Sequence, residues 1–415
     1  MYANRLVLAS FLVLFAVPGV TSSFGQTEPR RIVLFIGDGV GASYWTAAVY
    51  EQADLAVREF RVAGLVDTRA ATDDVTDSAA SATAFATGVR TYNGAIGVDV
   101  EGDSLRTVLD LAKQRGMSTG LVATSSITHA TPAAFAAHVP DRIMQYEIAR
   151  QIADSDVDVL LGGGRQFFDP ARRQDSLDLL ARLSNGHVLI SSPEELERLD
   201  KTVTPRLVGL FADNHMPKAA DRRPALADMT KAALGVLHRD PEGFFLMVEA
   251  SQPDWRGHGN EPLSEIVSEM LDFDRAIGVA LEYQRDHPET LIVVVSDHET
   301  GGLAIQTERD SVALTDAAGA LNSAAAGLAD VRAMVSASDA PTVDSTQVLL
   351  SRTVELLARQ AAAAGDKVSR VARYTTGYHT AQMVPLFASG PGAEKFSGII
   401  ANDQVGRLLM QELSR

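Results

Sequence analysis

The chain has 415 residues, 46% of them hydrophobic, so it can bury a large core as one α/β unit or as two or three domains. Its formal net charge of −16 argues against nucleic-acid binding as a main role, because a protein that binds a phosphate backbone needs a basic face. Small anionic substrates are not excluded, because bound cations can reverse the local charge of a site. The absence of cysteine excludes disulfides and thiolate ligands, so any metal must be bound by His, Asp and Glu.

The first residues are typical of a secretory leader. Arg5 is the only charged residue before Glu28, and Leu6–Val17 is an apolar run too short to span a bilayer comfortably. Small residues follow, which indicates cleavage near Gly25. We predict a signal peptide over residues 1–25 and a periplasmic or secreted mature chain with no membrane attachment; an uncleaved membrane anchor is the alternative.

Short β-branched apolar runs recur through residues 26–415. Runs without polar alternation are typical of strands that are buried on both faces. Helical patterns separate them, such as Ser104–Arg115, which is closed by Gly116. This alternation predicts an α/β fold: a large, mostly parallel central sheet with helices on both faces. The predicted strands are Ile32–Ile36, Gly120–Ala123, Val157–Leu161, Phe244–Val248, Leu291–Ser296 and Val384–Ala388.

Residues 307–370 differ in composition from the rest of the chain. They are rich in Ala and Ser, include the Ala-rich helical stretch Leu321–Ala337, and lack strong strand signals. We therefore predict an inserted cap at about 307–370, before the last predicted strand. A disordered linker is the alternative, and the helical periodicity of Thr346–Ala364 favours the cap.

Polar residues stand at the ends of several predicted strands. Asp38 follows the first strand, Glu249 follows the fourth, and Asp297 and His298 follow the fifth. In open α/β sheets the ligand site lies beyond the carboxyl ends of the strands, so these side chains can converge.

A second group of metal-ligating residue types lies between and after these strands. Asp254 and His258 are four residues apart and face the same way on a helix or compact turn, a spacing suited to zinc. His379 lies two residues after Gly377. Each residue alone is explained by a helix cap or a structural histidine, but together, on strand-end loops, they indicate a metal site.

Asp77 and Ser78 precede a run of small residues that predicts a helix starting at Ser78. The unpaired N–H groups and the positive dipole end of a helix start bind anions such as phosphate. A hydroxyl at that place is positioned to attack the anion. A capped helix with no further role is the alternative.

These segments together resemble the alkaline phosphatases. They follow the order of that family from Arg31 to the C-terminus, and the match over Asp77–Asn93 is long and specific, whereas the cap does not match closely. The matching segments are IGDGVG at 36–41, TDSAASATA at 76–84, TGVRTYNG at 87–94, HATPAA at 129–134, VEAS at 248–251 with Asp254 and His258, DHETGG at 297–302, and His379-Thr380.

The resemblance implies metal-dependent hydrolysis of phosphate monoesters at alkaline pH through a phosphoserine, small-molecule monoesters as substrates, and a homodimer. Ser78 matches the nucleophile. Arg142, by its position after residues 136–139, matches the arginine that holds two phosphate oxygens. The implied ligands are Asp254, His258 and His379 for one zinc; Asp38, Asp297, His298 and Ser78 for a second zinc; and Thr131, Glu249 and the bridging Asp38 for a third metal, usually magnesium.

Two implied neighbours of the site vary within the family. His129 stands where some members have Asp, and Trp255 where some have Lys or His, a pair that resembles certain bacterial members. Trp255 lacks the charge that would contact phosphate through water, so looser phosphate binding is expected. His129 suits zinc better than magnesium at the third site, so that site can hold Zn²⁺. Asp77 is expected to orient Arg142 and to cap the helix.

Other residues receive structural interpretations. His215, His238 and His287 are expected at the surface, His138 in the core or beside the site, Trp45 in packing, and Glu299 outside the ligand sets.

Two other functions compete with the monoesterase. A phosphodiesterase or sulfatase of the same superfamily would share the metal ligands, but the sequence around Asp77-Ser78, together with Arg142, favours the monoesterase. A non-catalytic metal- or phosphate-binding protein would require a lost nucleophile or a broken ligand set, and the sequence has neither.

Overall fold

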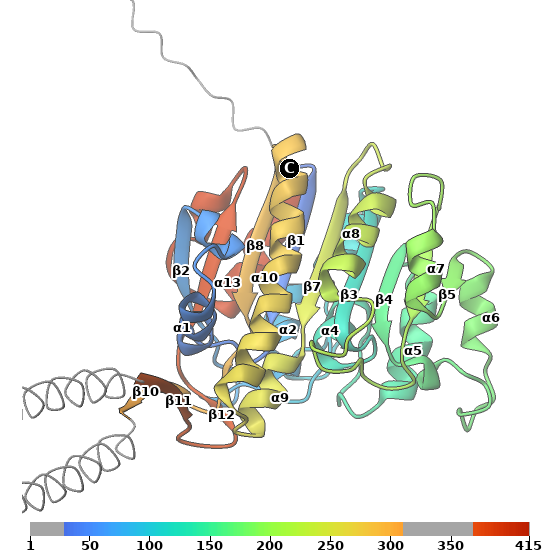
Figure 1. Ribbon diagram of the computed structural model, residues 1–415. Coiled ribbons are helices and arrows are strands. Elements are labelled where there is room, and N and C mark those ends of the chain that lie inside the picture. The colour runs from blue at the N-terminus through green and yellow to red at the C-terminus, as the bar shows by residue number, and fades with distance from the viewer. Residues whose placement is uncertain (1–28, 310–367, 415) are drawn as a thin grey trace, which may run out of the picture.

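A ten-stranded sheet forms the centre of the computed structural model, which describes residues 29–309 and 368–414 (Figure 1). Its strand order is β14-β2-β13-β8-β1-β7-β3-β4-β6-β5. All neighbouring pairs are parallel except those of β13 with β8 and β2, so the predicted mostly parallel sheet is confirmed. The strands are β1 (Arg31–Gly37), β2 (Val62–Asp67), β3 (Ser118–Ser126), β4 (Val159–Gly163), β5 (Val188–Ile190), β6 (Leu207–Leu210), β7 (Phe244–Ala250), β8 (Thr290–Ser296), β13 (Val384–Ser389) and β14 (Gly398–Ala401).

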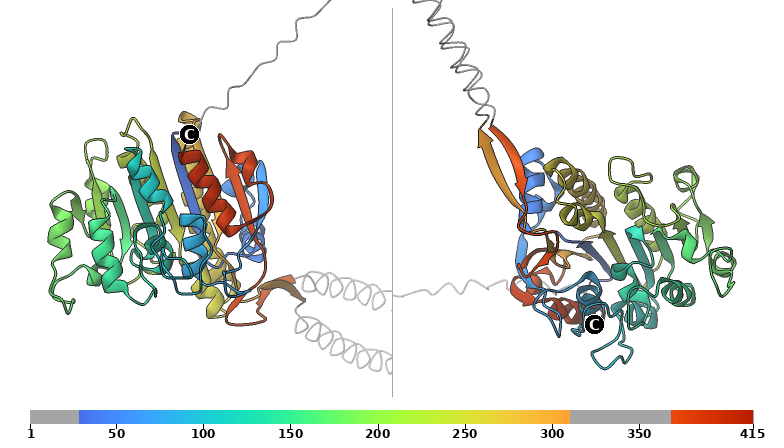
Figure 2. Two further views of the ribbon diagram at one scale, coloured as in Figure 1. Left: turned by 180° about the vertical axis from the view of Figure 1, so that it is seen from behind. Right: turned by 90° about the horizontal axis from the view of Figure 1, so that it is seen from below.

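Helices cover both faces of this sheet, as Figure 2 shows from two further sides. Alternate side chains of β1 enter opposite cores: Ile32 and Leu34 pack on one face, and Val33 and Phe35 on the other. The first face is covered by α2 (Ser78–Thr87), α3 (Val108–Gln114), α4 (Ala130–Ala136), α5 (Gln145–Asp154), α6 (Leu179–Ser184) and α13 (Asn402–Leu413). The second face is covered by α1 (Ala42–Glu51), α7 (Pro193–Arg198), α8 (Leu226–Leu237) and α10 (Leu263–Asp286).

Each predicted strand overlaps an observed one, but the predicted helix Ser104–Arg115 begins too early. The observed helix α3 starts at Val108 because Thr107 caps it: the Thr107 hydroxyl accepts from Asp110 N, and the Asp110 carboxylate accepts from Thr107 N. Ser104 instead forms an isolated bridge with Val98. Four strands of the sheet, β2, β5, β6 and β14, were not predicted from the sequence, and all but β6 are partly exposed.

Two strands flank the region predicted as a cap. β10 (Ala304–Arg309) and β11 (Val368–Arg373) pair as an antiparallel ribbon, so both ends of the predicted 307–370 insert are strand. The rest of the insert, and the predicted signal peptide at 1–25, lie outside the described residues. Within residues 29–309 and 368–414, we find no helix that combines the length and the apolar character needed to cross a membrane.

The register of the central strands brings the predicted strand-end residues to one edge. Glu249 on β7 lies level with Ile36 on β1, and Gly37 lies level with Ser296 on β8. Asp38 and Asp297 therefore follow side by side at the end of adjacent strands. Short elements collect at this edge: α9 (Gln252–His258), β9 (Glu299–Thr300) and β12 (His379–Thr380), with β9 and β12 paired.

Candidate active site

Ser78 is the first residue of α2, as the sequence predicts. Asp77 caps the helix through Oδ1, which accepts from Ala80 N at 2.9 Å. Every residue of α2 is buried, which explains its small side chains. The Ser78 side chain is 2% exposed, and its Oγ lies 3.2 Å from His298 Nε2. A hydroxyl at a helix start is therefore held directly against a predicted metal ligand.

Arg142 lies beside this helix start. Its Nη1 donates to Asp77 Oδ2 at 3.0 Å and its Nη2 donates to His129 Nε2 at 3.2 Å. Asp77 thus both caps α2 and anchors the arginine, the two roles expected for it. A guanidinium has five N–H donors, so these two contacts leave donors for an anion.

Asp254, His258 and His379 converge from α9 and β12. His258 Nε2 lies 3.1 Å from His379 Nε2 and 3.3 Å from Asp254 Oδ1, and His379 Nε2 lies 3.5 Å from the same oxygen. The Nδ1 atoms of the two rings face carbonyl oxygens of Gly377 and Thr76 at 2.7 and 2.9 Å. Because a carbonyl only accepts, Nδ1 carries the hydrogen and Nε2 presents its lone pair to the cluster.

The spacing of these three atoms fits a tetrahedral zinc. Zn–N and Zn–O bonds of about 2.0–2.1 Å place tetrahedral ligand atoms about 3.3 Å apart. Two nitrogen lone pairs and a carboxylate oxygen at such distances repel one another unless a cation lies between them.

Asp38, Asp297 and His298 form a second cluster, and all three are fully buried. His298 Nε2 lies 3.5 Å from Asp38 Oδ1 and 3.3 Å from Asp297 Oδ2. Asp297 Oδ1 accepts from Gly39 N at 3.0 Å. Gly39 has φ +74°, and a Cβ there would lie 2.7 Å from the Asp254 Cα, so only glycine lets this loop pass between the two clusters.

Thr300 fixes the ring orientation of His298. The Thr300 hydroxyl donates to Asp254 Oδ1, so its oxygen is free to accept from His298 Nδ1 at 3.3 Å. The Nε2 lone pair of His298 then faces the second cluster and Ser78. Thr300 was not predicted as a site residue from the sequence, although it belongs to the matching segment 297–302.

Asp38 also belongs to a third cluster, with Glu249 and His129. Thr131, on α4, is fully buried. Among the described residues, several buried polar atoms of the second and third clusters have no hydrogen-bond partner, which is unusual for carboxylates in a core. These atoms are Asp38 Oδ1 and Oδ2, Asp297 Oδ2, Glu249 Oε1, Thr131 Oγ1 and His129 Nδ1.

Burial and mutual repulsion disfavour negative charge on these carboxylates. Burial raises the pKa of Asp297 to about 8 and that of Glu249 to about 7, and it raises the pKa of Asp38 well above its ordinary value. Burial also lowers the pKa of His298, which keeps its imidazole neutral. Buried carboxylates with neutral imidazoles are the donor set that divalent cations take, so the residues fit bound metals.

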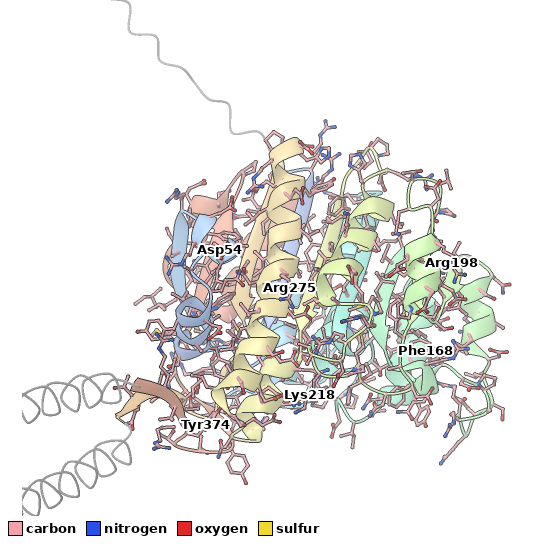
Figure 3. The ribbon with its side chains drawn as sticks, viewed as in Figure 1. Asp54, Phe168, Arg198, Lys218, Arg275 and Tyr374 are labelled. Atoms are coloured by element: carbon pink, nitrogen blue, oxygen red, sulfur yellow. The ribbon has the colours of Figure 1, made fainter. Side chains whose placement is uncertain are left out.

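His129 and Trp255 lie together at the third cluster, in edge-to-face contact with ring centroids 6.1 Å apart. The expectation that His215 lies at the surface is wrong: it is half-buried, with its ring 4.6 Å from Trp255 and 5.6 Å from His129. It comes from the loop after β6, which runs to Lys218 at the same end of the sheet as α9 (Figure 3). No spacing in the sequence relates these three residues.

The remaining residues with structural interpretations agree largely with expectation. Trp45 packs against Phe273 and Phe387, and His238 is exposed. His287 differs from expectation in the same way as His215, because it is half-buried against Tyr283 rather than at the surface. His138 bonds Gly97 O through Nδ1, and Glu299 accepts from Gly302 N and Leu303 N.

Comparisons with known proteins agree with this geometry. The alkaline phosphatase family profile matches residues 29–414. Alkaline phosphatase 3 of Bacillus subtilis is 35% identical over 423 residues, covering 94% of this chain and 90% of that protein. The alkaline phosphatase from the Antarctic bacterium TAB5 superposes with a TM-score of 0.74 and 32% identity, covering 94% of this chain and 99% of that one. A TAB5 variant in which a histidine is replaced by aspartate has Mg bound in its M3 site. It superposes with a TM-score of 0.75 and 31% identity, covering 94% of this chain and 99% of that one.

Proposed function

The chain belongs to the alkaline phosphatase family, and we propose that Ser78 is the nucleophile of its reaction and that a phosphoserine is the intermediate. The chain is a metal-dependent hydrolase of phosphate monoesters. One observation carries the assignment of Ser78: its Oγ lies at a helix start, 3.2 Å from His298 Nε2 and next to the Asp77–Arg142 pair.

We propose two zinc ions and one magnesium ion as cofactors. Asp254, His258 and His379 would hold one zinc; Asp38, Asp297, His298 and Ser78 would hold the second; Thr131, Glu249 and Asp38 would hold the magnesium. The mutual distances of 3.1–3.5 Å within the first two sets support the zinc assignment. The imidazole of His129 suits zinc, so the third site can also take Zn²⁺, and the Mg of the TAB5 aspartate variant is consistent with that preference.

The reaction takes place in two displacements. When bound, divalent cations lower the pKa of a hydroxyl or water and stabilise the negative charge that develops on oxygen. Ser78 Oγ attacks phosphorus, the new O–P bond forms as the ester P–O bond breaks, and the alcohol leaves. Arg142 holds the non-bridging oxygens with its remaining N–H groups, and Asp77 fixes its plane. Water then attacks the same phosphorus, the Ser78–phosphorus bond breaks, and inorganic phosphate leaves.

Ser78→Ala tests this assignment against Ser81→Ala. Ser81 lies one turn later on the same buried helix, so the two variants lose the same atom from similar surroundings. We expect Ser78→Ala to lower kcat for p-nitrophenyl phosphate at least about 10³-fold with metal content retained, and Ser81→Ala to stay within a few-fold of the unsubstituted protein. Mass spectrometry after an acid quench should find phosphate on the Ser78 peptide. Undiminished hydrolysis by metal-loaded Ser78→Ala would refute the covalent mechanism.

The competing activities are separated by substrate and by metal removal. Turnover of bis-p-nitrophenyl phosphate above that of the monoester would favour a phosphodiesterase. Chelation should abolish hydrolysis, and Zn²⁺ with Mg²⁺ should restore it. Metal and phosphate binding without turnover would indicate a binding protein.

We also propose an exported homodimer of the bacterial subtype that carries His129 and Trp255. The composition of residues 1–25 supports export. Mass measurement of the mature chain outside the cytoplasm should show loss of residues 1–25, and the native mass should correspond to two copies. A mature chain that keeps residues 1–25 would contradict cleavage of the signal peptide. A native mass of one copy would contradict the homodimer.

A further inference from the structure

His215 is fixed at the edge of the site by its own hydrogen bond and by those of its neighbour. Its Nδ1 accepts from Ser126 N at 3.0 Å, at the end of β3. Met216 donates its N–H to Thr124 O at 3.2 Å, and its carbonyl accepts from Gln252 Nε2 at 2.7 Å. Because a backbone N–H only donates, Nδ1 is the acceptor and Nε2 carries the hydrogen, so the ring has one hydrogen-bonded orientation.

The loop beyond His215 is held from a second direction. Arg222 is 1% exposed and donates to Glu269 Oε2 at 2.9 Å and to Asp272 Oδ2 at 2.6 Å, both on α10. Its Nε donates to Pro217 O at 3.1 Å. A buried arginine between two buried carboxylates holds the backbone that carries His215 against α10.

The fixed imidazole closes a triangle of three rings. The ring of His215 lies 4.6 Å from Trp255 at 60° and 5.6 Å from His129 at 89°, and the rings of Trp255 and His129 meet at 85°. Tilted and edge-to-face contacts at these separations are favourable. His129 in turn accepts from Arg142 Nη2 at 3.2 Å, so the ring cluster reaches the arginine.

We propose that His215 is a positioning residue for phosphate binding, which keeps Trp255 and His129 in place and thereby keeps the Arg142 guanidinium in its orientation. This inference rests on the proposed function, in which Arg142 binds the phosphate oxygens. Within the part of the chain that the structure describes, Arg142 has two side-chain anchors, His129 and Asp77. Without the His215 ring, the His129 anchor loosens while Asp77 remains. Phosphate affinity and KM therefore depend on His215 more than kcat does.

Two substitutions separate the ring from its hydrogen bond. His215→Asn keeps a side-chain acceptor for Ser126 N and removes the ring, whereas His215→Phe keeps a ring and removes the acceptor. We expect His215→Asn to raise KM for p-nitrophenyl phosphate and the inhibition constant of phosphate about 3- to 10-fold, with kcat within about twofold. His215→Phe should bring both constants back to within about twofold of the unsubstituted protein. Bound metal should be unchanged in both, and a loss of metal would overturn the proposal in favour of a ligand role.

Tryptophan fluorescence reads the ring contact without any turnover. The chain has two tryptophans, so a Trp45→Phe background leaves Trp255 as the single emitter. In that background, His215→Asn should increase the emission of Trp255 and lower its anisotropy. His238→Asn is the matched control, because His238 packs on Tyr283 with its Nδ1 hydrogen-bonded to the Tyr283 hydroxyl, beyond the amino end of β7.

The outcomes distinguish the two proposals. A folded His215→Asn variant with unchanged phosphate inhibition and unchanged Trp255 emission overturns the role of His215. If that variant does not fold, His215→Gln is the second ring-free variant and the same criterion applies. An unsubstituted protein with bound metals but no turnover contradicts the proposed function, and the emission of Trp255 still tests the ring contact.

Discussion

The buried carboxylates make the metal-free protein less stable as pH rises, and Asp297→Asn should remove the part of that dependence that Asp297 contributes. Folding raises the pKa of Asp297 to about 8, well above the value near 4 of an unfolded Asp. The folded state therefore binds more protons than the unfolded state between these values. The contribution of Asp297 to the free energy of unfolding is highest below about pH 4, falls as pH rises toward 8, and levels off above it.

The size of the effect follows from the pKa values of Asp297 and Glu249. Between pH 6 and pH 9, a folded pKa of about 8 for Asp297 lowers the free energy of unfolding by about 3 kcal/mol, and a pKa of about 7 for Glu249 lowers it by about 1 kcal/mol. Asn at 297 cannot ionise, but its side-chain oxygen can still accept from Gly39 N and His298 N. Asp297→Asn should thus remove about 3 kcal/mol of pH-dependent loss between pH 6 and pH 9, and the share of Glu249 should remain.

Urea unfolding in the presence of a chelator, at pH 6, 7, 8 and 9, measures this dependence. Asp154→Asn, which changes an exposed carboxylate, should keep the full loss. The stability of the metal-loaded protein should depend little on pH over this range, because metal binding displaces the same protons. An Asp297→Asn variant whose stability changes between pH 6 and pH 9 with the same slope as that of the unsubstituted metal-free protein would contradict this role of Asp297.

Three further predictions concern the site and its supports. Trp255→Lys should lower the inhibition constant of phosphate about 3- to 10-fold because it adds a cation, and unchanged inhibition would count against looser phosphate binding. Asp77→Ala should lower the free energy of urea unfolding by about 1 kcal/mol and also raise KM, because it removes both the helix cap and the anchor of Arg142. Asp77→Asn should keep the cap and raise only KM. Equal stability of the two variants would contradict the capping role. Arg222→Met should lower the free energy of unfolding by about 3–5 kcal/mol, because it leaves the carboxylates of Glu269 and Asp272 buried without their arginine. A decrease below about 1 kcal/mol would contradict this stabilising role of the buried ion pairs.

The sequence by itself determined features that depend on local rules. The helix start at Ser78 follows from Asp77 as the cap, and the buried strands follow from apolar runs without alternation. The convergence of Asp38 and Asp297 follows from a general property of parallel sheets, since strand ends share one edge. The helix predicted from Ser104 was too long because the cap at Thr107 competes with its first turn.

Only the tertiary structure decided which distant loops meet. His129, His215 and Trp255 come from the loops after β3 and β6 and from α9, which follows β7. Their contact depends on the strand order β7-β3-β4-β6 and on the buried Arg222 that holds the intervening loop. A local pattern contains no information on that order, because the long crossover that joins two parallel strands can place the second strand at different positions in the sheet. The sequence therefore predicted the candidate ligand residues that converge at this edge, and the packing of the sheet revealed the histidine beside them.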